Sequence, residues 1–278
     1  MTRNIKLTIS IVLFNTPFFQ VERALRVLQN VESLSRVYLI DNSPTKISAS
    51  DFDNFPQFCE IIHNKNNGYV AHNIGIRRAM EDGSSYHLVL NADVSFTAMT
   101  LERMVQTMES NKDVGMLFPK VIFQDGRNQR LAKRLPNPVE LFLRLCGLKN
   151  IPRFDITSSS DSVRPVRISF ASGCFMLMRT ELLRKIGLMD ERFFMYGEDI
   201  DLCRRISSQS ELVYAPCFEI AHDFDGLSKR NLKLLLVHVV NVVRYFNKWG
   251  WFFDNNRKNI ICEHQANPSF PLIVKNEN

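Results

Sequence analysis

The first half of the chain alternates short, almost wholly apolar runs with stretches in which apolar residues recur every three or four positions. The apolar runs, at residues 7–14, 36–43, 59–64 and 86–93, are typical of parallel strands that are covered on both faces. The stretches that follow the first, third and fourth runs predict amphipathic helices that cross from one strand to the next. This alternation predicts an α/β fold with a Rossmann-like, mostly parallel open sheet flanked by helices.

Polar residues follow each of these predicted strands. They are Asn15, Asp41 and Asn42, the run 64–67, and Asn91 with Asp93. The carboxyl ends of parallel strands meet at one edge of a sheet, and ligands of open α/β sheets bind at that edge. We therefore expect the binding site among these residues.

Length, composition and charge limit the number of domains and the classes of partner that the protein can have. The 278 residues suit one large domain, or one domain with a terminal appendage, and 45% hydrophobic residues allow a sizeable core. A formal net charge of +6 suits a phosphorylated substrate or an anionic membrane surface. Nucleic acid is the weakest partner hypothesis, because the sequence has no zinc-finger spacing, RNA-binding signature or Lys/Arg block.

The cysteine pattern and the first residues bear on the compartment. Six scattered cysteines without a CxxC motif favour buried free thiols in a reducing environment. The start of the chain superficially resembles a signal peptide, but no small-residue cleavage site follows its apolar run, which we interpret as a buried strand. No apolar run reaches the length of about 18 residues that spans a bilayer. We expect a cytoplasmic protein.

Three carboxylates crowd into four positions of the stretch "RFFMYGEDIDLCRR". If a helix begins near Gly197, Glu198 and Asp199 fall in its first turn, where the helix dipole favours acids. Asp201 and Arg205 are four residues apart and can pair along the helix surface, and Arg204 can reach back similarly. Glu198 and Asp199 then lack a structural explanation, so we interpret one of them as a general base.

Four further features each allow a functional and a structural interpretation. Asp93 follows a buried strand and is either a divalent-metal ligand beside a nucleotide diphosphate or part of a helix-capping loop. Asp41 either accepts the ring N–H of uracil or thymine or closes an Asx-turn. Gly68 and Gly75 bracket a helix start whose free N–H groups suit phosphate or ribose. His222, which ends a short strand, is either a ligand or a packed side chain.

The order of these blocks is more specific than any one of them. Asp-Asn after a strand, "NNGY", "LNADV", "SGCFML", "DERFFMYGEDIDLC" and a His before a basic helix together resemble glycosyltransferase family 2. The match is most similar to the bacterial rhamnosyltransferase branch that builds O-antigens and other surface polysaccharides, and it runs from Leu7 to Trp251. The resemblance implies a GT-A fold, a nucleotide-sugar donor, a Mg²⁺ or Mn²⁺ ion and inversion at the anomeric carbon.

The resemblance also assigns roles. Asp41 matches the acid that reads the base, and the DxD motif falls on Asn91-Ala92-Asp93, in which Asn91 can bond a ribose hydroxyl and Asp93 keeps the metal-ligand role. His222 matches a position that completes the metal site in some relatives, and Asp199 matches the base, with Glu198 as its neighbour. The donor-binding set that we predict is Asn15, Asp41, Asn42, Asn67, Gly68, Asn73, Asn91 and Asp93.

The branch resemblance favours dTDP-L-rhamnose as donor and a saccharide on undecaprenyl diphosphate as acceptor. One alternative is a UDP-sugar donor, which could be a hexose, a hexosamine or galactofuranose. Another is a catalytically silent subunit that binds a sugar nucleotide or a lipid, and the presence of both Asp93 and Asp199 argues against it.

The predicted domain comprises residues 1–227, with a nucleotide-binding half at 1–118 and an acceptor half at 119–227. Residues 228–251 predict a basic amphipathic helix, and a polar, loosely held tail is expected after Arg257. Such a helix either lies on an anionic membrane, here the cytoplasmic face of the inner membrane, or packs on the sheet with its basic side solvated. We favour a mixture, in which the apolar face packs on the domain and the basic end lies near anionic lipid.

Overall fold

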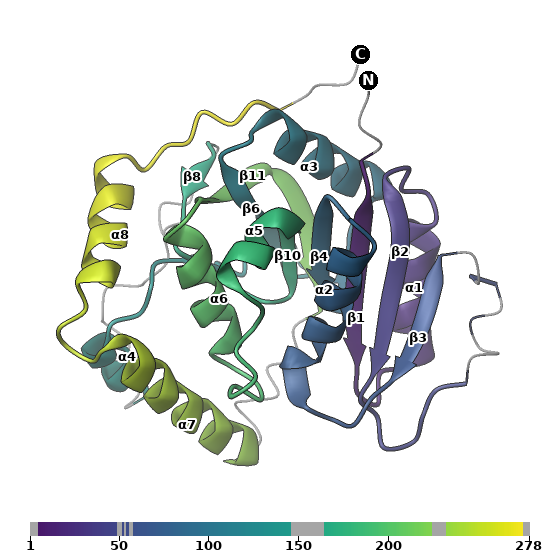
Figure 1. The fold of residues 1–278 in the computed structure, drawn as a ribbon, viewed down its shortest axis with the longest axis horizontal. Coiled ribbons are helices and arrows are strands. Elements are labelled where there is room, and N and C mark those ends of the chain that lie inside the picture. The colour runs from purple at the N-terminus through teal and green to yellow at the C-terminus, as the bar shows by residue number, and fades with distance from the viewer. Residues whose placement is uncertain are drawn as a thin grey trace.

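The computed structural model describes residues 5–48, 52, 54–55, 58–145, 164–223 and 232–274. Its centre is a nine-stranded sheet in the order β3-β2-β1-β4-β10-β6-β11-β5, with β8 paired to β11, and β7 and β9 form a small second sheet (Figure 1). The strands are β1 (Leu7–Leu13), β2 (Leu34–Asp41), β3 (Cys59–His63), β4 (Tyr86–Leu90), β5 (Val94–Ser95), β6 (Val114–Ile122), β7 (Ala132–Lys133), β8 (Val166–Arg167), β9 (Phe170–Ala171), β10 (Phe175–Arg179) and β11 (Glu211–His222). The helices are α1 (Phe18–Leu28), the 3₁₀ helix η2 (Gly68–Ala71), α2 (His72–Glu81), α3 (Ala98–Ser110), α4 (Pro138–Leu145), α5 (Thr180–Ile186), α6 (Glu198–Ser207), α7 (Leu232–Trp249) and α8 (Asn255–Ala266).

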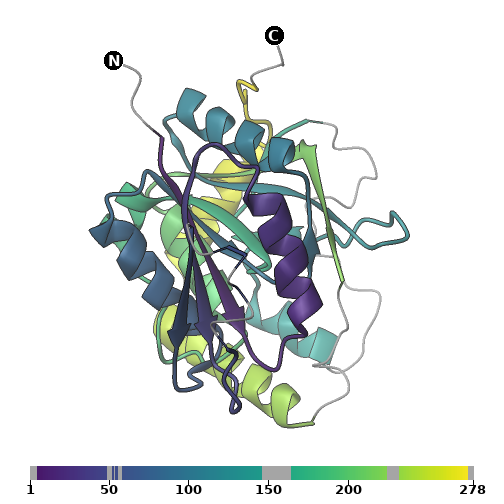
Figure 2. The same cartoon turned by 90° about the vertical axis from the view of Figure 1, so that its right-hand side faces the viewer.

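The parallel half of the sheet forms as its apolar runs predict. Strands β1 to β4 run parallel to one another, and every residue of β4 is buried. Helices α1 and α2 cover opposite faces of these strands (Figure 2). Burial on both faces is the reason that the runs are continuous rather than alternating in polarity.

The second half of the sheet brings the ends of distant strands to the same edge. Strand β10 is antiparallel to both of its neighbours, β4 and β6, whereas β11 is parallel to β6. The sheet is therefore mostly parallel, and β1, β2, β3, β4, β6 and β11 all end at one edge. We predicted two short strands in the last stretch, but they form the single strand β11, with a register shift between Ala215 and Glu219.

A polar network that the sequence did not reveal lies inside this core. The Ser10 hydroxyl contacts His72 Nδ1 at 2.7 Å and His87 Nε2 at 2.8 Å, and the Thr8 hydroxyl lies 2.9 Å from His87 Nδ1. Burial lowers the pKa of both histidines to about 3, so they are neutral at physiological pH. The His72 ring packs on Tyr69, with ring centroids 4.6 Å apart, and supports a side chain of the candidate site.

The C-terminal region differs from its expectation. Helix α7 confirms the predicted amphipathic helix from Leu232 onward, while the predicted start at residues 228–231 lies outside the described residues. The tail that we expected to be loose after Arg257 forms α8, which Asp254 caps by accepting a hydrogen bond from the Arg257 N–H. Buried Arg257, Ile260 and His264 hold α8 against the domain.

The helices and the cysteines of the described residues bear on the expected environment of the protein. Within the described residues, no helix is both long enough and apolar enough to span a bilayer. Five cysteines of the described chain are free: Cys174 and Cys203 are buried as expected, and Cys59 is half-buried. Cys217 and Cys262 are exposed, so the expectation of buried thiols was wrong for these two.

A buried ion pair joins α6 to the start of α8. We expected Arg204 to reach back toward the acids of its own helix, but its guanidinium instead forms a two-pronged pair with Asp254, one prong at 2.7 Å. Both side chains are almost fully buried, and the guanidinium also stacks on Trp249, 4.2 Å from the ring centroid. Arg204 therefore fixes the C-terminal helices on the domain rather than neutralising the acid cluster.

Asp254→Asn should lower the free energy of unfolding by about 3–5 kcal/mol, because it leaves a buried guanidinium without its counter-charge while keeping the helix cap. Asp125→Asn is the matched control: it removes a carboxylate from an exposed pair with Arg127, for which little or no loss of stability is expected. Urea denaturation measures both losses, and equal losses in the two variants would contradict this role of Asp254.

Candidate active site

The candidate site lies at the carboxyl edge, where β4, β10 and β11 meet. The Asn91 N–H donates to the Cys174 carbonyl (3.0 Å), which ties the end of β4 to the start of β10. The chain then runs from Asp93 into β5, which pairs antiparallel with the end of β11 so that Val94 faces His222. Through this short pairing, the residues that follow β4 lie beside the end of β11.

The pairing brings together the two predicted metal ligands. His222 Nε2 lies 3.4 Å from Asp93 Oδ1, and the Asp93 side chain remains 29% exposed, so it is accessible to a ligand. The imidazole is buried and is oriented by Gln129, whose amide oxygen lies 3.2 Å from His222 Nδ1 and whose amide nitrogen donates to the His222 carbonyl. A proton on Nδ1 shared with Gln129 directs Nε2 toward Asp93, an outer partner typical of metal-binding histidines. No motif or spacing in the sequence pointed to Gln129.

The donor set fits a divalent cation that is shared with a ligand. A carboxylate oxygen and an imidazole nitrogen suit Mn²⁺ and are compatible with Mg²⁺. Within the described residues, no cluster of three or more His, Cys, Asp or Glu side chains could hold a metal by itself. The remaining positions around such an ion would fall to water and to the oxygens of a bound diphosphate.

The loop 190–197 positions the second group of acids, Glu198 and Asp199, at the start of α6. Tyr196 and Gly197 both have positive φ, 66° and 113°, and the chain enters α6 directly after them at Glu198. Gly197 is required there because its φ lies in the left-handed region and a Cβ would meet the Phe193 ring at 3.1 Å. Two successive left-handed residues are unusual outside functional loops, because non-glycine residues are strained there.

Glu198 and Asp199 share a desolvated environment. Burial first, and then the charge of Asp199, raise the pKa of Glu198 well above its usual range. The Glu198 Oε2 atom is buried and has no hydrogen-bond partner among the described residues. Burial also raises the pKa of Asp199, against the opposing effects of hydrogen bonds from the Ile200 and Gly197 N–H groups and of the Lys133 charge.

Tyr69 and Cys174 lie between the two groups of acids. Burial raises the pKa of Tyr69, and the charges of Glu198, Asp199 and Asp93 add to that effect. Burial likewise raises the pKa of Cys174 to about 12, with contributions from Asp93 and Asp199. The Tyr69 hydroxyl donates to the Gly173 carbonyl and lies 3.2 Å from Asn91 Oδ1. The structure thus gathers both groups of acids around one tyrosine, although they are about a hundred residues apart in sequence.

The third acid of the cluster has a purely structural environment. Asp201 pairs with Arg205 as predicted, at 3.0 Å, but it is fully buried and the expectation of a surface pair was wrong. Its other oxygen accepts from the Trp249 indole and from the Lys248 ammonium, both at 2.7 Å. The carboxylate therefore links α6 to α7 and has no room for a substrate.

The predicted base-reading residue is engaged by its own chain. Asp41 is fully buried, and its carboxylate accepts hydrogen bonds from the N–H groups of Ser43 (2.9 Å) and Ile47 (3.0 Å). Burial alone would raise the pKa of Asp41, but the hydrogen bonds from Ser43, Ile47 and His63 outweigh it and lower the pKa. The Asx-turn interpretation describes this geometry, and direct contact with a base would require the turn to open.

Two further members of the predicted donor set serve packing. Asn73 is buried and bonds both the N–H and the carbonyl of Met189, at 3.0 and 2.8 Å, so it joins α2 to the loop before the acids. The Gly68 N–H donates to the Asn66 side chain and the Tyr69 N–H donates to the Phe194 carbonyl, so these groups are not free for phosphate as expected.

The other predicted donor-binding residues surround the same edge. Asn42 is buried and bonds the Gly68 carbonyl at 3.0 Å, while Asn15 and Asn67 are exposed. The Asn15 N–H donates to the Ser43 hydroxyl, and Asn67 accepts from the Asn64 amide at 2.9 Å. The side chains of Asn15 and Asn67 are therefore accessible from solvent beside Asp41.

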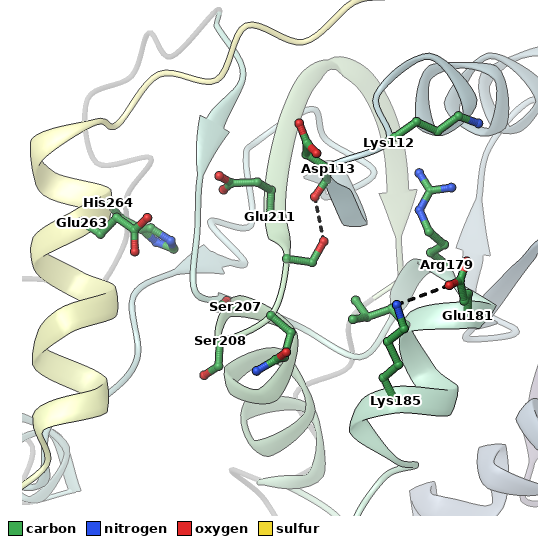
Figure 3. A pocket seen from close by; sticks show the side chains of 13 residues that line it. Lys112, Asp113, Arg179, Glu181, Lys185, Ser207, Ser208, Glu211, Glu263 and His264 are labelled. Carbon is green, nitrogen blue, oxygen red and sulfur yellow. Dashed lines mark hydrogen bonds and ion pairs between the residues drawn. The ribbon is translucent and has the colours of Figure 1, made fainter.

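A separate cavity of about 660 Å³ lies at the opposite, amino edge of the sheet (Figure 3). Its walls carry acids and bases in similar number, and Glu181 pairs with Lys185 at 3.3 Å. It contains none of the residues gathered around Tyr69, and we assign the site to the carboxyl edge instead.

Glu198→Gln should flatten the dependence of stability on pH. Because the folded state raises the pKa of Glu198, it holds a proton that the unfolded chain loses above about pH 4. The resulting stabilisation is complete below that pH and is lost as pH rises through the folded pKa, by up to about 1.4 kcal/mol per pH unit. Gln does not titrate, so the melting temperature of the variant should gain on wild type between pH 4 and pH 8. Glu32→Gln, at an exposed carboxylate, is the control, and parallel pH curves for wild type and Glu198→Gln would contradict the assignment.

The chain is similar in sequence to known glycosyltransferases. Over 142 residues, 28% are identical to an N-acetylglucosaminyl-diphospho-decaprenol L-rhamnosyltransferase of Mycobacterium tuberculosis, a match that covers 49% of this chain and 46% of the relative. A low-salt glycan biosynthesis hexosyltransferase of Haloferax volcanii is 27% identical over 142 residues, which cover 50% of this chain and 43% of the relative. The chain thus matches about half the length of these curated relatives.

The fold comparison extends over nearly the whole chain. The mannosyltransferase PcManGT of Pyrobaculum calidifontis, solved in complex with GDP-Man and Mn²⁺, superposes with a TM-score of 0.56 at 14% identity. The superposition covers 97% of this chain and 78% of that protein, and the shared architecture is the GT-A fold. A family model described as Glycosyl transferase family 2 matches residues 8–187, which is more than half of the chain. The chain therefore belongs to glycosyltransferase family 2.

Proposed function

We propose that the protein is an inverting glycosyltransferase that moves L-rhamnose from dTDP-L-rhamnose to a lipid-linked saccharide. The observation that carries the proposal is the convergence of the Asp93–His222 pair and of Glu198 and Asp199 around Tyr69 at one sheet edge. The Asp93–His222 pair suits the diphosphate of the donor with its cation. Glu198 and Asp199 suit the acceptor hydroxyl, which must lose a proton.

Asp199 acts as the general base. As the acceptor oxygen bonds to the anomeric carbon, its proton passes to the Asp199 carboxylate, and the bond from that carbon to the diphosphate breaks with its electron pair going to the diphosphate. A raised pKa makes Asp199 a stronger base near neutral pH than an ordinary aspartate. Glu198 is the more deeply buried of the two acids, and when it holds its proton it does not repel the ionised base beside it.

Asp93 and His222 would hold one Mg²⁺ or Mn²⁺ ion, which supplies positive charge against the diphosphate leaving group when bound. Gln129 keeps the imidazole in the orientation that this task needs. Asn15 and Asn67 offer exposed amides to the nucleoside, and Asn91 offers one to the ribose.

The donor sugar is the finer part of the proposal. The M. tuberculosis relative is named a rhamnosyltransferase, which supports L-rhamnose. The H. volcanii relative is named a hexosyltransferase at nearly the same identity, which supports a UDP-hexose or related UDP-sugar as the second candidate. Measuring hydrolysis and transfer with a panel of dTDP-, UDP- and GDP-sugars tests both, and turnover of a UDP-sugar but not of dTDP-L-rhamnose would overturn the first.

The proposed acceptor and the proposed cellular location both rest on the name of the M. tuberculosis relative. Its name includes a diphospho-decaprenol, which supports a polyprenyl diphosphate, here undecaprenyl diphosphate, as the carrier of the acceptor saccharide. Such a lipid is confined to a bilayer, so the protein is proposed to work at the cytoplasmic face of the inner membrane.

Asp93→Ala should remove the metal-dependent part of nucleoside diphosphate binding and abolish transfer, because it deletes the carboxylate ligand. His222→Ala should weaken Mn²⁺ binding by about tenfold or more, and Gln129→Ala should do so through the histidine orientation. Titration calorimetry of dTDP with and without Mn²⁺ measures these effects. Asp223→Asn is the control, since this neighbouring carboxylate pairs with Arg23, and unchanged metal-dependent binding in Asp93→Ala would refute the assignment.

Asp199→Asn should lower kcat by roughly 10² to 10⁴-fold, the usual contribution of a general base, with donor affinity nearly unchanged. Asp201→Asn should instead lower the free energy of unfolding by about 3 kcal/mol, because the buried carboxylate has charged partners, while the folded fraction retains turnover. Steady-state transfer assays and thermal melts separate the two roles. If Asp201→Asn abolished turnover while Asp199→Asn remained active, the base would be Asp201.

A further inference from the structure

Helix α7 has two faces with different environments. Its inner face carries His238, Asn241, Tyr245 and Lys248, which contact the loop 190–197 or α6. Its outer face is an apolar stripe at the spacing of one helix side, and all of its members are exposed: Leu232, Leu235, Leu236, Val239, Val240 and Val243. We call these six residues the outer stripe.

The outer stripe is too large and too regular to be incidental surface. Leu232 is 78% exposed and Leu236 64%, and none of the residues from 232 to 240 is buried. Just beyond the helix, Trp251, Phe252 and Phe253 are also exposed, Phe253 at 95%. Contiguous exposed apolar surface of this kind marks an interaction site.

The charges around the stripe identify its partner as an anionic bilayer. Helix α7 contains Lys233 and Arg244 and no acidic residue, in a chain with a formal net charge of +6. Its third basic residue, Lys248, belongs to the inner face, where Asp190 and Asp201 neutralise it. An amphipathic helix with basic flanks and aromatic residues at its end lies in the interface of anionic membranes. A second copy of the chain would bring two such basic helices together, which their like charges oppose.

The inner face ties this helix to the loop that carries the acids. The Asn241 amide donates to the Met195 carbonyl at 2.7 Å, and Arg244 donates to the Arg192 carbonyl at 2.7 Å. The His238 ring stacks on Tyr196, with centroids 5.0 Å apart and planes 22° from parallel. Tyr196 is one of the two left-handed residues immediately before Glu198, so α7 supports the strained turn that positions the base.

Both views place α7 beside the functional edge. In Figures 1 and 2 it lies along the side of the molecule toward which the arrowheads of β1, β2 and β3 point. A bilayer against the outer stripe would therefore lie next to the edge that holds Asp93 and Asp199.

We propose that the outer stripe docks on an anionic bilayer and that, through His238 and Asn241 on the inner face, docking fixes the loop 190–197 and so activates the enzyme. The activation rests on the proposed function, whereas the docking does not. The segment 232–240 makes few buried contacts in water, and insertion of its apolar face stabilises the helical conformation that supports Tyr196.

Flotation with phosphatidylcholine vesicles, with and without phosphatidylglycerol, tests docking. Wild type should bind the anionic vesicles and dissociate as salt rises. The double variant Leu236→Glu/Val240→Glu should partition about tenfold or more less strongly. Met99→Glu is the matched control, an apolar residue 58% exposed on α3 at the opposite side of the molecule (Figure 1), and it should bind as wild type does.

Docking is overturned if wild type does not bind, or if the double variant binds equally well. It is also overturned if sedimentation shows a lipid-independent dimer that Leu236→Glu/Val240→Glu dissociates, because the stripe would then bind a second copy. Circular dichroism establishes that the variants are folded.

Hydrolysis of the preferred nucleotide sugar by water tests activation without a lipid acceptor. Anionic vesicles should raise kcat of wild type at least about threefold with KM little changed, and should not raise that of Leu236→Glu/Val240→Glu, which keeps the basal rate. His238→Ala should bind vesicles normally yet lose the stimulation, which a merely structural role would not produce. Turnover that vesicles leave unchanged overturns activation while the proposed function stands, and absence of turnover with every donor refutes the function while flotation still decides docking.

Discussion

Burial of the parallel strands on both faces is the constraint on which the site depends. Helices cover β1 to β4, so polar groups can reach solvent only where strands end. The antiparallel strand β10 preserves this arrangement, because it begins at the edge where its neighbours finish and adds Gly173 and Cys174 to that edge. The pairing of β5 with β11 then carries Asp93 to His222 across two intervening strands. The chemistry of this edge is thus a consequence of topology and not of any single motif.

The parts of the site that could be predicted are those set by local sequence. An apolar run that ends in a polar tip places Asp93, and a glycine followed by acids places Glu198 and Asp199 at a helix start. The pair of Asp201 with Arg205 follows from a spacing of four residues on one helix. Each of these inferences needs only a few neighbouring residues, and the structure has the corresponding elements.

The parts that could not be predicted depend on partners far along the chain. Asp201 is covered by Lys248 and Trp249 of α7, which bond to its carboxylate. Asn73 bonds to the backbone of Met189, which is 116 residues away in sequence. Neither contact can be inferred from neighbouring residues. Gln129 comes from an irregular turn with no recognisable motif, yet it orients His222. The polar composition after Arg257 predicted a loose tail, whereas α8 forms there. The three buried side chains and the buried ion pair that hold this helix cannot be recognised from composition.

The approach of two backbones at Gly68 has a mechanical consequence. A Cβ at this position would lie 1.9 Å from the Phe194 carbonyl oxygen, and that same carbonyl accepts the Tyr69 N–H at 2.8 Å. The main chain of η2 and the loop that leads to Asp199 are therefore in direct contact, with no Cβ between them to absorb a displacement. A displacement of η2 is thus expected to move this loop through main-chain contact alone.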